Sequence, residues 1–430
     1  MKTKIGKLKS NIKSVMKNFL SEFPSFDLLD KEMKGISFPE YREANGHIHT
    51  PYSFSAFTAL DTAFKMAVEE KIAVLGINDF YVTDGYNAFH KGCLINKIFP
   101  LFNIEFIGLL KEEQKMGIRI NDPNNPGRIY FSGKGLDYPF QVGWIQRRLL
   151  RNVKKESQVQ IKAMISKLNQ LLERERPALK LSYETIKKEY AHELVRERHL
   201  AKALRELAVT LSPSGEEQLR FIENMYGGKK SKTGMLNPAA LEIEIRSNLL
   251  KSGGLAFVEE NENSFLELRK IIKIIIKAGG IPCYPVLLDD PSGKCTEFES
   301  DPEKLCSSLN YLGIECIELI PGRNDFTILK NFVEFFNNKG FIITFGTEHN
   351  TPEMLPLTVT TRGLKPLDES LKKIAWNGAC VIAAHQYLRA NGRQGYVLPD
   401  GTHSKEQMKD LISLGQLVIE YFLNKYENET

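Results

Sequence analysis

From residue 41 onwards, short apolar runs alternate with segments in which apolar residues recur at helical spacing. The first run contains His47 and His49, the second ends at Asn78 and Asp79, and the third contains Glu105. The pattern predicts strands at residues 72–77 and 101–109, and helices at residues 60–70 and 85–95. A buried strand with a polar end, followed by a helix and another strand, is typical of a parallel α/β sheet or barrel.

The middle of the chain has a different pattern. Residues 144–175 carry one apolar stripe at helical spacing, Pro177 ends it, and a second helix is predicted from Ser182 to about residue 207. The α/β pattern then returns, with predicted strands at 281–288, 312–320 and 340–346, a helix at 326–338, and two further apolar segments at 367–377 and 379–390. We therefore expect a helical insertion within an α/β domain.

These patterns divide the chain into four parts. They are a basic N-terminal helix or arm (1–40), a barrel formed by two segments (41–110 and 255–350), a mainly helical insertion (111–254), and an α-rich C-terminal extension (351–430). At 430 residues, the chain is long enough for two or three structural units or for one large domain with insertions.

Composition narrows the class of protein. Apolar residues make up 42% of the chain and charged residues 26%, which is ordinary for a globular protein and excludes a disordered or collagen-like one. No uncharged apolar run reaches the length of a membrane span, and the basic N-terminus lacks the apolar core of a secretory signal. We expect a cytoplasmic protein with no membrane partner.

The six cysteines include no CxxC pair, so neither a zinc knuckle nor a disulfide framework is predicted.

Charge is uneven along the chain. The net charge is +5, yet residues 144–205 alone contain 16 lysines and arginines against 7 glutamates. Such a stretch is either a footprint for phosphate or nucleic acid, or the solvated face of a helix. Aromatic residues are not interleaved with these cations as single-strand binding would require, so nucleic acid is not the favoured partner.

The most specific chemical feature is the pair His47 and His49. Residues i and i+2 of a strand point to one face, so both imidazoles can bind one ion at about 2.0–2.1 Å. Acidic residues and a histidine recur at later strand ends, and in a parallel barrel these ends form the active site. They are Asp79, Glu105, Glu348 and His349. A carboxylate within an apolar strand, as at Glu105 and less clearly at Glu318, is costly to bury without a cation.

Several segments together resemble the PHP (polymerase and histidinol phosphatase) superfamily of metal-dependent phosphoesterases. The opening segment is similar to the family's DLHxHT motif, and the others match family segments in the same order. They are residues 45–50 (NGHIHT), 77–80 (INDF), 103–106 (NIEF), 195–204 (VRERHLAKAL), 253–258 (GGLAFV), 278–282 (AGGIP) and 346–348 (GTE). The resemblance implies a distorted seven-stranded (β/α) TIM-like barrel with metals at the strand ends. It also implies that His199 is a metal ligand.

The chain departs from the family pattern at several ligand positions. Phe54, Phe80, Tyr284 and Asn350 stand where the family has ligands, and the histidine expected about ten residues after Glu105 has no counterpart. The family usually assembles two or three metals, so we expect a reduced site with one ion, or two. The expected metal ligands are His47, His49, Glu105, His199 and Glu348. Asp79 and His349 are the expected proton carriers. Imidazole and carboxylate ligands suit Zn, Mn or Fe.

Cationic residues that follow the later strands are candidates for binding an anionic substrate. They are Arg323 and Arg362, with His385 and Arg389 in the C-terminal extension, and a guanidinium suits phosphate or carboxylate. The favoured function is a metal-dependent hydrolase acting on a small anionic substrate, most simply a phosphate ester. The alternatives are a mononuclear isomerase or lyase acting on a sugar acid, a nuclease or nucleic-acid binder that uses the basic insertion, and an interaction protein with a decayed site.

Overall fold

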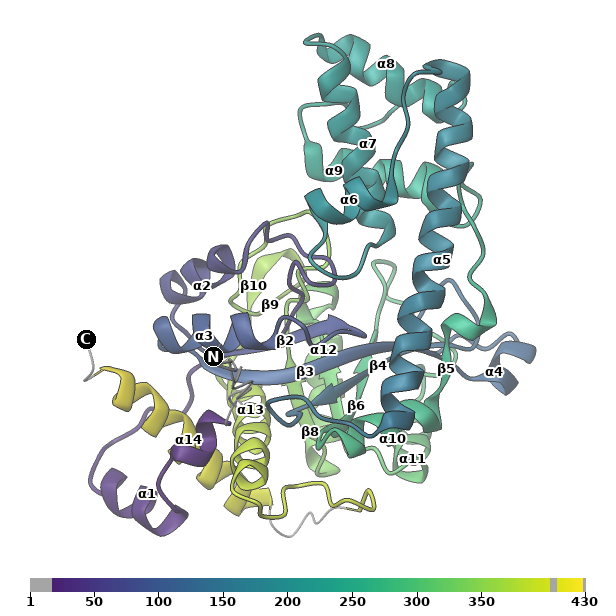
Figure 1. Ribbon diagram of the computed structural model, residues 1–430. Coiled ribbons are helices and arrows are strands. Elements are labelled where there is room, and N and C mark those ends of the chain that lie inside the picture. Colours follow the sequence, from purple (N-terminus) through teal and green to yellow (C-terminus); the bar gives the residue numbers. More distant parts are fainter. Residues whose placement is uncertain (1–17, 403–407, 428–430) are drawn as a thin grey trace, which may run out of the picture.

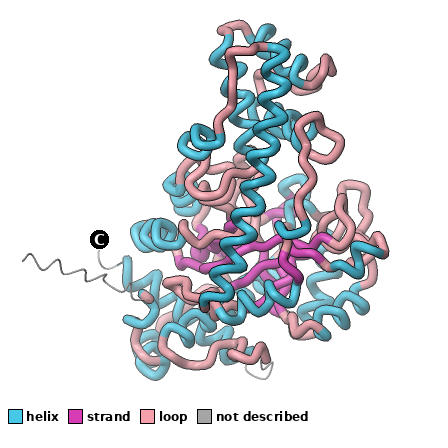
Figure 2. The backbone as a smooth tube through the Cα atoms, turned by 45° about the vertical axis from the view of Figure 1, so that its right-hand side comes forward, coloured by secondary structure: helices cyan, strands magenta, loops and turns pink. Residues whose placement is uncertain are grey.

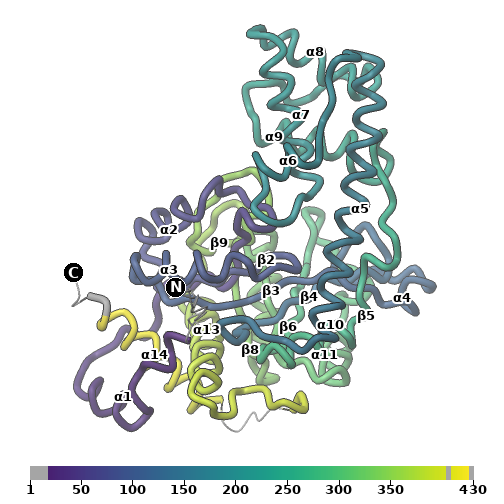
Figure 3. The backbone as a smooth tube through the Cα atoms, viewed as in Figure 1, coloured from purple at the N-terminus to yellow at the C-terminus, as the bar shows by residue number. Residues whose placement is uncertain are grey.

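The computed structural model describes residues 18–402 and 408–427. The first 17 residues of the predicted basic arm lie outside the described residues. The described part of the arm holds η1 (Phe19–Glu22) and α1 (Phe26–Met33), which pack beside the C-terminal helix α14 (Met408–Glu427). Phe19 and Phe23 make edge-on contacts with Phe422 and Tyr421, with ring centroids 6.0 and 5.1 Å apart. The two ends of the described chain therefore lie side by side (Figure 3).

Seven strands form one continuous path in a mixed sheet. Their order is β1 (Glu43–Ile48), β2 (Ile72–Phe80), β3 (Phe99–Leu109), β4 (Arg128–Lys134), β6 (Ile281–Val286), β7 (Cys316–Leu319) and β8 (Ile342–Phe345). All neighbours are parallel except β4, which is antiparallel to both β3 and β6. A short strand, β5 (Leu266–Glu267), extends β3, and β9 (Thr360–Thr361) pairs with β10 (Lys365–Pro366).

The two ends of this path meet, so the sheet is nearly closed into a barrel. Ile48 forms a parallel bridge with Glu348, just beyond β8. The His49 amide donates to the Glu348 carbonyl at 2.8 Å, and the Glu348 amide donates to the His47 carbonyl at 2.9 Å. The predicted α/β fold with a distorted seven-stranded barrel is confirmed. The closure also places the histidine pair beside the end of the last strand.

Helices pack against the outside of the barrel, where the apolar stripe of each helix is buried against the outward-facing apolar side chains of the strands. They are α2 (Leu60–Glu69), α3 (Tyr86–Ile95), α10 (Leu268–Lys277), α11 (Pro302–Tyr311) and α12 (Phe326–Asn338). Short elements complete the connections: α4 (Lys111–Lys115), η3 (Glu262–Ser264), η4 (Pro321–Arg323) and η5 (Arg362–Leu364). All six cysteines are unpaired, and five of them are buried.

The C-terminal extension contains one long helix where the apolar pattern predicts two segments. α13 (Glu369–Ala390) is continuous and packs against β8, β1 and α14. Gly378 in its middle allows this close approach, because a Cβ at this position would lie 2.0 Å from the Ile343 carbonyl oxygen. Gly378, which lies between the two predicted segments, is thus a packing residue, and the helix runs through it.

The helical insertion forms a lobe beside the sheet (Figures 1 and 2). It comprises α5 (Trp144–Glu175), α6 (Tyr183–Tyr190), α7 (Glu197–Leu211), α8 (Gly215–Met225), α9 (Pro238–Ile245) and the π-turn η2 (Arg246–Leu250). The lobe has its own apolar core, which includes Leu168, Leu204, Ile222 and Leu241. The predicted range 111–254 also contains β4, which belongs to the barrel sheet. Among the described residues, no helix is both long and apolar enough to cross a membrane.

Candidate metal centre

Three buried side chains meet at the mouth of the barrel. His47 and His49 project from the end of β1, and Glu105 reaches them from β3. The two Nε2 atoms are 3.2 Å apart, and Glu105 Oε2 lies 3.1 Å from His49 Nε2 and 3.8 Å from His47 Nε2. Donors at about 2.0–2.1 Å from a tetrahedral ion are about 3.3 Å apart. The three atoms are therefore spaced as ligands of one divalent ion.

The hydrogen bonding of Glu105 also fits a cation. The residue is 1% exposed, and its Oε2 atom accepts no hydrogen bond within the described structure. Burial raises the pKa of Glu105 to about 7, although the neighbouring His47 opposes the shift. A buried carboxylate oxygen without a donor is unfavourable, and a bound cation would remove that penalty.

Both imidazoles are held neutral, the form that binds metal. Burial lowers the pKa of His47, against the attraction of Glu318. Burial lowers the pKa of His49 further, and the charges of Arg196 and Arg198 add to the effect. A neutral imidazole has one nitrogen with a free lone pair, and in both rings Nε2 is the atom that faces Glu105 Oε2. The Asn78 side-chain amide nitrogen lies 3.1 Å from each ring nitrogen of His47.

A buried carboxylate lies behind His47. Glu318, on β7, places Oε2 2.9 Å from His47 Nδ1, and Lys134, on β4, donates to its Oε1 atom. Burial raises the pKa of Glu318, but His47 and Lys134 outweigh it and hold the pKa at about 2. Lys134 has no counterpart in the sequence predictions, since a lysine at the end of a strand in a predicted insertion carries no signal of this contact.

Asp79 lies behind His49 and does not line the cavity. Its carboxylate accepts hydrogen bonds from the Thr50 amide at 2.7 Å, from the Ser53 hydroxyl at 2.6 Å and from the Thr50 hydroxyl. Its Oδ1 atom is 3.9 Å from His49 Nδ1. Burial raises the pKa of Asp79 to about 7, while these hydrogen bonds oppose the shift. The geometry places Asp79 as an anchor of the loop after β1.

Two predicted residues after β8 point in different directions. Glu348 lines the cavity, and its carboxylate pairs with Arg323. His349 points away, with Nδ1 2.8 Å from the Thr347 hydroxyl, Nε2 2.8 Å from the Leu355 carbonyl, and its ring stacked on Phe57. The structure thus brings Glu348 to the rim of the centre and turns His349 away from it.

His199 is not brought to the three converging donors. It lies in the first turn of α7, where its Nδ1 atom accepts a hydrogen bond from the Arg196 amide at 2.9 Å. Its ring packs edge-on against Phe54, with the centroids 4.9 Å apart. The imidazole therefore caps the N-terminus of the helix.

Three of the four predicted anion-binding residues lie away from the cavity and contact other protein groups. Arg362 pairs with Asp289 at 3.0 Å, and Arg389 pairs with Asp137 at 2.6 and 2.7 Å. His385 donates from Nε2 to the Gly279 carbonyl at 2.6 Å and accepts at Nδ1 from the Tyr396 amide at 2.9 Å. None of the three lines the cavity beside the metal centre, whereas Arg323 does.

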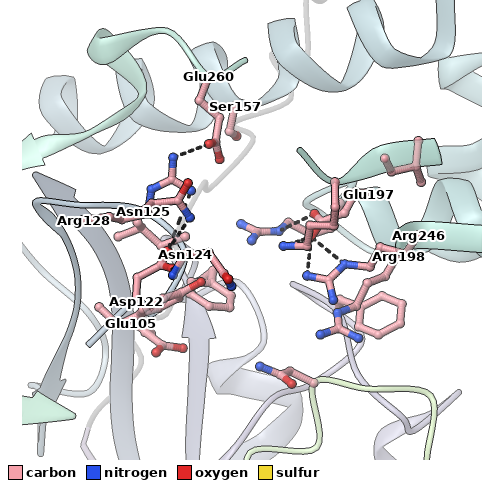
Figure 4. A pocket seen from close by; sticks show the side chains of 18 of the residues that line it. Glu105, Asp122, Asn124, Asn125, Arg128, Ser157, Glu197, Arg198, Arg246 and Glu260 are labelled. Carbon is pink, nitrogen blue, oxygen red and sulfur yellow. Dashed lines mark hydrogen bonds and ion pairs between the residues drawn. The ribbon is translucent and has the colours of Figure 1, made fainter. Parts of the chain in front are cut away.

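That cavity has a volume of about 870 Å³ and extends from His47 and Glu105 to the helical insertion. One wall holds Asp122, Asn125 and Arg128, and the opposite wall holds Glu197, Arg198 and Arg246 (Figure 4). Glu105 lies at the base in this view. The insertion therefore covers the barrel mouth and supplies part of the site.

On the insertion side of the cavity, several lysine and arginine side chains surround a single glutamate, Glu197. Glu197 accepts from Arg246 at 2.8 Å and lies 3.9 Å from Lys251 and 3.8 Å from Arg196. Arg198 contacts Phe54 through a cation–π interaction, with 5.5 Å between the guanidinium carbon and the ring centroid. It forms no ion pair with a carboxylate among residues 18–402 and 408–427. Burial and the charge of Arg246 lower the pKa of Arg198 to about 9.

The sequence identifies Arg196 and Arg198 as part of a basic segment, but it does not show that they line the site. Arg196 and Arg198 lie in the segment 195–204 and contribute to the basic stretch, which is typical of a solvated helix face and less often of a phosphate- or nucleic-acid-binding surface. Their direction toward the barrel mouth depends on how α7 packs, which no local pattern encodes.

Comparisons with known proteins find distant structures only. No family model matches the sequence, and no curated protein matches it. One solved structure, of a protein from Bifidobacterium adolescentis named as a metal-dependent phosphoesterase, has 14% identity and a TM-score of 0.49, covering 77% of this chain and 95% of its own. Another, an amidohydrolase from Chromobacterium violaceum solved with sulfate and no metal, has 13% identity and a TM-score of 0.45, covering 77% and 96%. At this distance neither structure assigns an activity, so function is argued from the site.

Proposed function

We propose that this protein is a metal-dependent hydrolase of small phosphate esters, with one divalent ion held by His47, His49 and Glu105. The observation that carries the proposal is the convergence of two neutral Nε2 atoms and one carboxylate oxygen without a donor. The donor set suits Zn, Mn or Fe. When bound, such an ion polarises a substrate oxygen and lowers the pKa of water toward 7.

The other groups in the cavity suit the binding of an anion. Arg198 has a guanidinium without a carboxylate partner in the described chain, and Arg323 lies on the barrel side next to Glu348. A guanidinium binds phosphate through paired hydrogen bonds, and it stabilises negative charge that develops during hydrolysis. Aromatic side chains, among them Phe80 and Tyr130, form part of the cavity wall. We place the phosphate between the metal centre and Arg198.

The first test is the metal content of the purified protein, measured by elemental analysis after exchange into metal-replete buffer. We expect one ion per chain in the wild type and none in the His47→Ala/His49→Ala variant. The matched control is His90→Phe, because His90 lies among Phe19, Phe102 and Tyr138, and its Nε2 has no partner in the described structure. This control should keep its ion. A wild type without a bound ion contradicts the proposal.

The second test is catalytic. The metal-loaded protein is assayed against a panel of phosphomonoesters and phosphodiesters, with release of phosphate or alcohol as the readout. We expect turnover that chelation abolishes and added metal restores.

A second candidate is a mononuclear isomerase or lyase acting on a sugar acid. The observation that favours it is that only three donors converge in the described structure, since phosphoryl transfer benefits most from paired ions. A metal-loaded protein that is inactive on every phosphate ester but transforms sugar acids would favour this candidate.

A further inference from the structure

A buried ionic chain behind the metal centre is not used in the function proposed above. Lys134 and Glu318 are both 0% exposed, and they lie on strands β4 and β7, far apart in the sequence. Lys134 Nζ donates to one carboxylate oxygen of Glu318, and the other oxygen faces His47 Nδ1 at 2.9 Å. Lys134 therefore contacts Glu318, and Glu318 contacts the His47 ring.

Stability alone does not account for this pair. Removing an ammonium and a carboxylate from water costs several kcal/mol, and apolar residues of similar volume often stabilise a protein as well or better. Ile317 and Leu319 flank Glu318 on β7 and point to the other face of the sheet, because side chains alternate along a strand. On its own face, Glu318 contacts His47, Lys134 and Ser132. The chain is therefore better explained by its effect on the ring that it contacts.

The contact determines how His47 can bind an ion. A carboxylate beside Nδ1 holds the proton of the neutral ring on that nitrogen, which leaves the lone pair on Nε2. In this structure Nε2 is the atom that faces His49 Nε2 and Glu105 Oε2. Lys134 engages the remaining oxygen of Glu318, so the carboxylate is held in one orientation.

Among the described residues, the Nδ1 atom of the second histidine, His49, has no carboxylate at hydrogen-bond distance. His49 Nδ1 lies 3.3 Å from the Ser53 hydroxyl, and the nearest carboxylate oxygen, of Asp79, is 3.9 Å away. The two ligands are thus supported differently, which allows the effect on His47 to be separated from a general effect on the centre.

We propose that Glu318 and Lys134 are positioning residues that hold His47 with its proton on Nδ1 and direct its Nε2 atom at the metal. This inference rests on the proposed metal site. It predicts a function for two residues that do not touch the ion or the substrate.

The first experiment measures the His47 tautomer directly. Selective ¹⁵N labelling of the eight histidines allows the two ring nitrogens to be distinguished by NMR in the metal-free protein. We expect His47 to carry its proton on Nδ1 in the wild type and to show a mixture of tautomers in Glu318→Gln. A proton on Nε2 in the wild type, or an unchanged tautomer in the variant, overturns the proposal.

The second experiment measures affinity for Zn²⁺ and Co²⁺ by competition with a chelator. In Glu318→Gln we expect binding weakened by about 10- to 100-fold, and in Lys134→Met by a smaller factor. The matched control is Glu299→Gln. Glu299 is also a buried carboxylate, but it accepts from Tyr284 and from the Leu287 and Leu288 amides, away from the histidines. The metal affinity of the Glu299→Gln variant should stay at the wild-type value.

Glu318→Gln leaves Lys134 without its carboxylate, so this variant has a folding risk. The double variant Lys134→Met/Glu318→Gln removes both charges and should fold, as judged by circular dichroism, while its metal affinity stays 10- to 100-fold weak. Wild-type affinity in a folded double variant overturns the positioning role while the metal site stands. A wild type that binds neither Zn²⁺ nor Co²⁺ overturns the proposed function instead.

Discussion

Two regions of the molecule contain buried histidines beside charged residues, and their hydrogen bonding differs. At the barrel mouth, His47, His49 and Glu105 turn Nε2, Nε2 and Oε2 toward one another, and Glu105 Oε2 has no donor in the described structure. In the C-terminal extension, His385 uses both ring nitrogens on backbone groups, and Arg389 forms a bidentate pair with Asp137.

The comparison shows that residue types alone do not make a site. Both regions offer imidazole and charge, but the groups of the second are paired with one another, whereas three donor atoms of the first converge closely enough to bind one cation. Buried polar groups are normally paired, so a converging set that is not paired is the more informative observation.

The largest expected difference between the two regions comes from Glu105→Gln. Replacing one of three ligands should reduce the bound metal to less than a tenth of the wild-type content and lower kcat/KM by a factor on the order of 1,000. Stability of the metal-free protein should not fall, because the variant removes a buried carboxylate oxygen that lacks a donor. Elemental analysis, steady-state kinetics and thermal unfolding measure these quantities. Full metal content in Glu105→Gln would show that the three donors are not a ligand set.

The reciprocal change in the C-terminal extension is His385→Leu. It leaves the Gly279 carbonyl and the Tyr396 amide unpaired in a buried place, and each such group costs roughly 1–3 kcal/mol. We expect the free energy of unfolding in urea to fall by roughly 2–4 kcal/mol while metal content stays at one ion per chain. Loss of the ion in the folded His385→Leu variant would contradict the assignment of metal binding to the barrel mouth alone.

Two arginines sharpen the comparison at the level of catalysis. Arg198→Met should lower kcat/KM for a phosphomonoester by roughly 10- to 100-fold, because a charge-assisted contact to the phosphate is lost. Metal content should not change. Arg389→Met is the matched control, and its kcat/KM should stay within about twofold of the wild type. Equal effects of the two substitutions would remove Arg198 from the proposed anion site.

A further expected effect is a dependence of stability on pH that arises at the barrel mouth. Burial raises the pKa of Glu105 to about 7, so in the metal-free protein its contribution to stability is present below its usual pKa and is lost as the pH rises through about 7. Urea unfolding of wild type and Glu105→Gln from pH 4 to 8 should show a stability difference that shifts in favour of the variant as pH rises. Saturating metal should reverse this trend, since the ion binds the carboxylate. A constant difference across this range would contradict the raised pKa.

The histidine pair shows what local pattern can predict. His47 and His49 share a face because side chains alternate along a strand, and this alternation holds wherever the strand lies. The pattern likewise places Asp79 and Glu105 on predicted strands, but of these two only Glu105 lines the cavity. The α/β class and the helical nature of residues 144–175 were predictable for the same reason, since periodicity is a property of neighbouring residues.

His199 shows where local pattern is insufficient. Its segment resembles a metal-binding one, yet in the structure its imidazole accepts from the Arg196 amide and caps α7. A histidine at the first turn of a helix has this alternative partner within three residues, and only the packing of α7 on the barrel determines which one it uses.

The sequence by itself determined the barrel strands other than β4, the shared face of His47 and His49, and the candidate acidic residues at the strand ends. The tertiary structure alone decided that Glu105 meets that face, that Lys134 and Glu318 stand behind it, and that Arg198 faces the cavity. The reason is physical: periodicity depends on adjacent residues, whereas these contacts depend on strand order, barrel closure and the packing of an inserted lobe. The same holds for His385 and Arg389, whose partners lie more than 100 residues away or across a turn after α13.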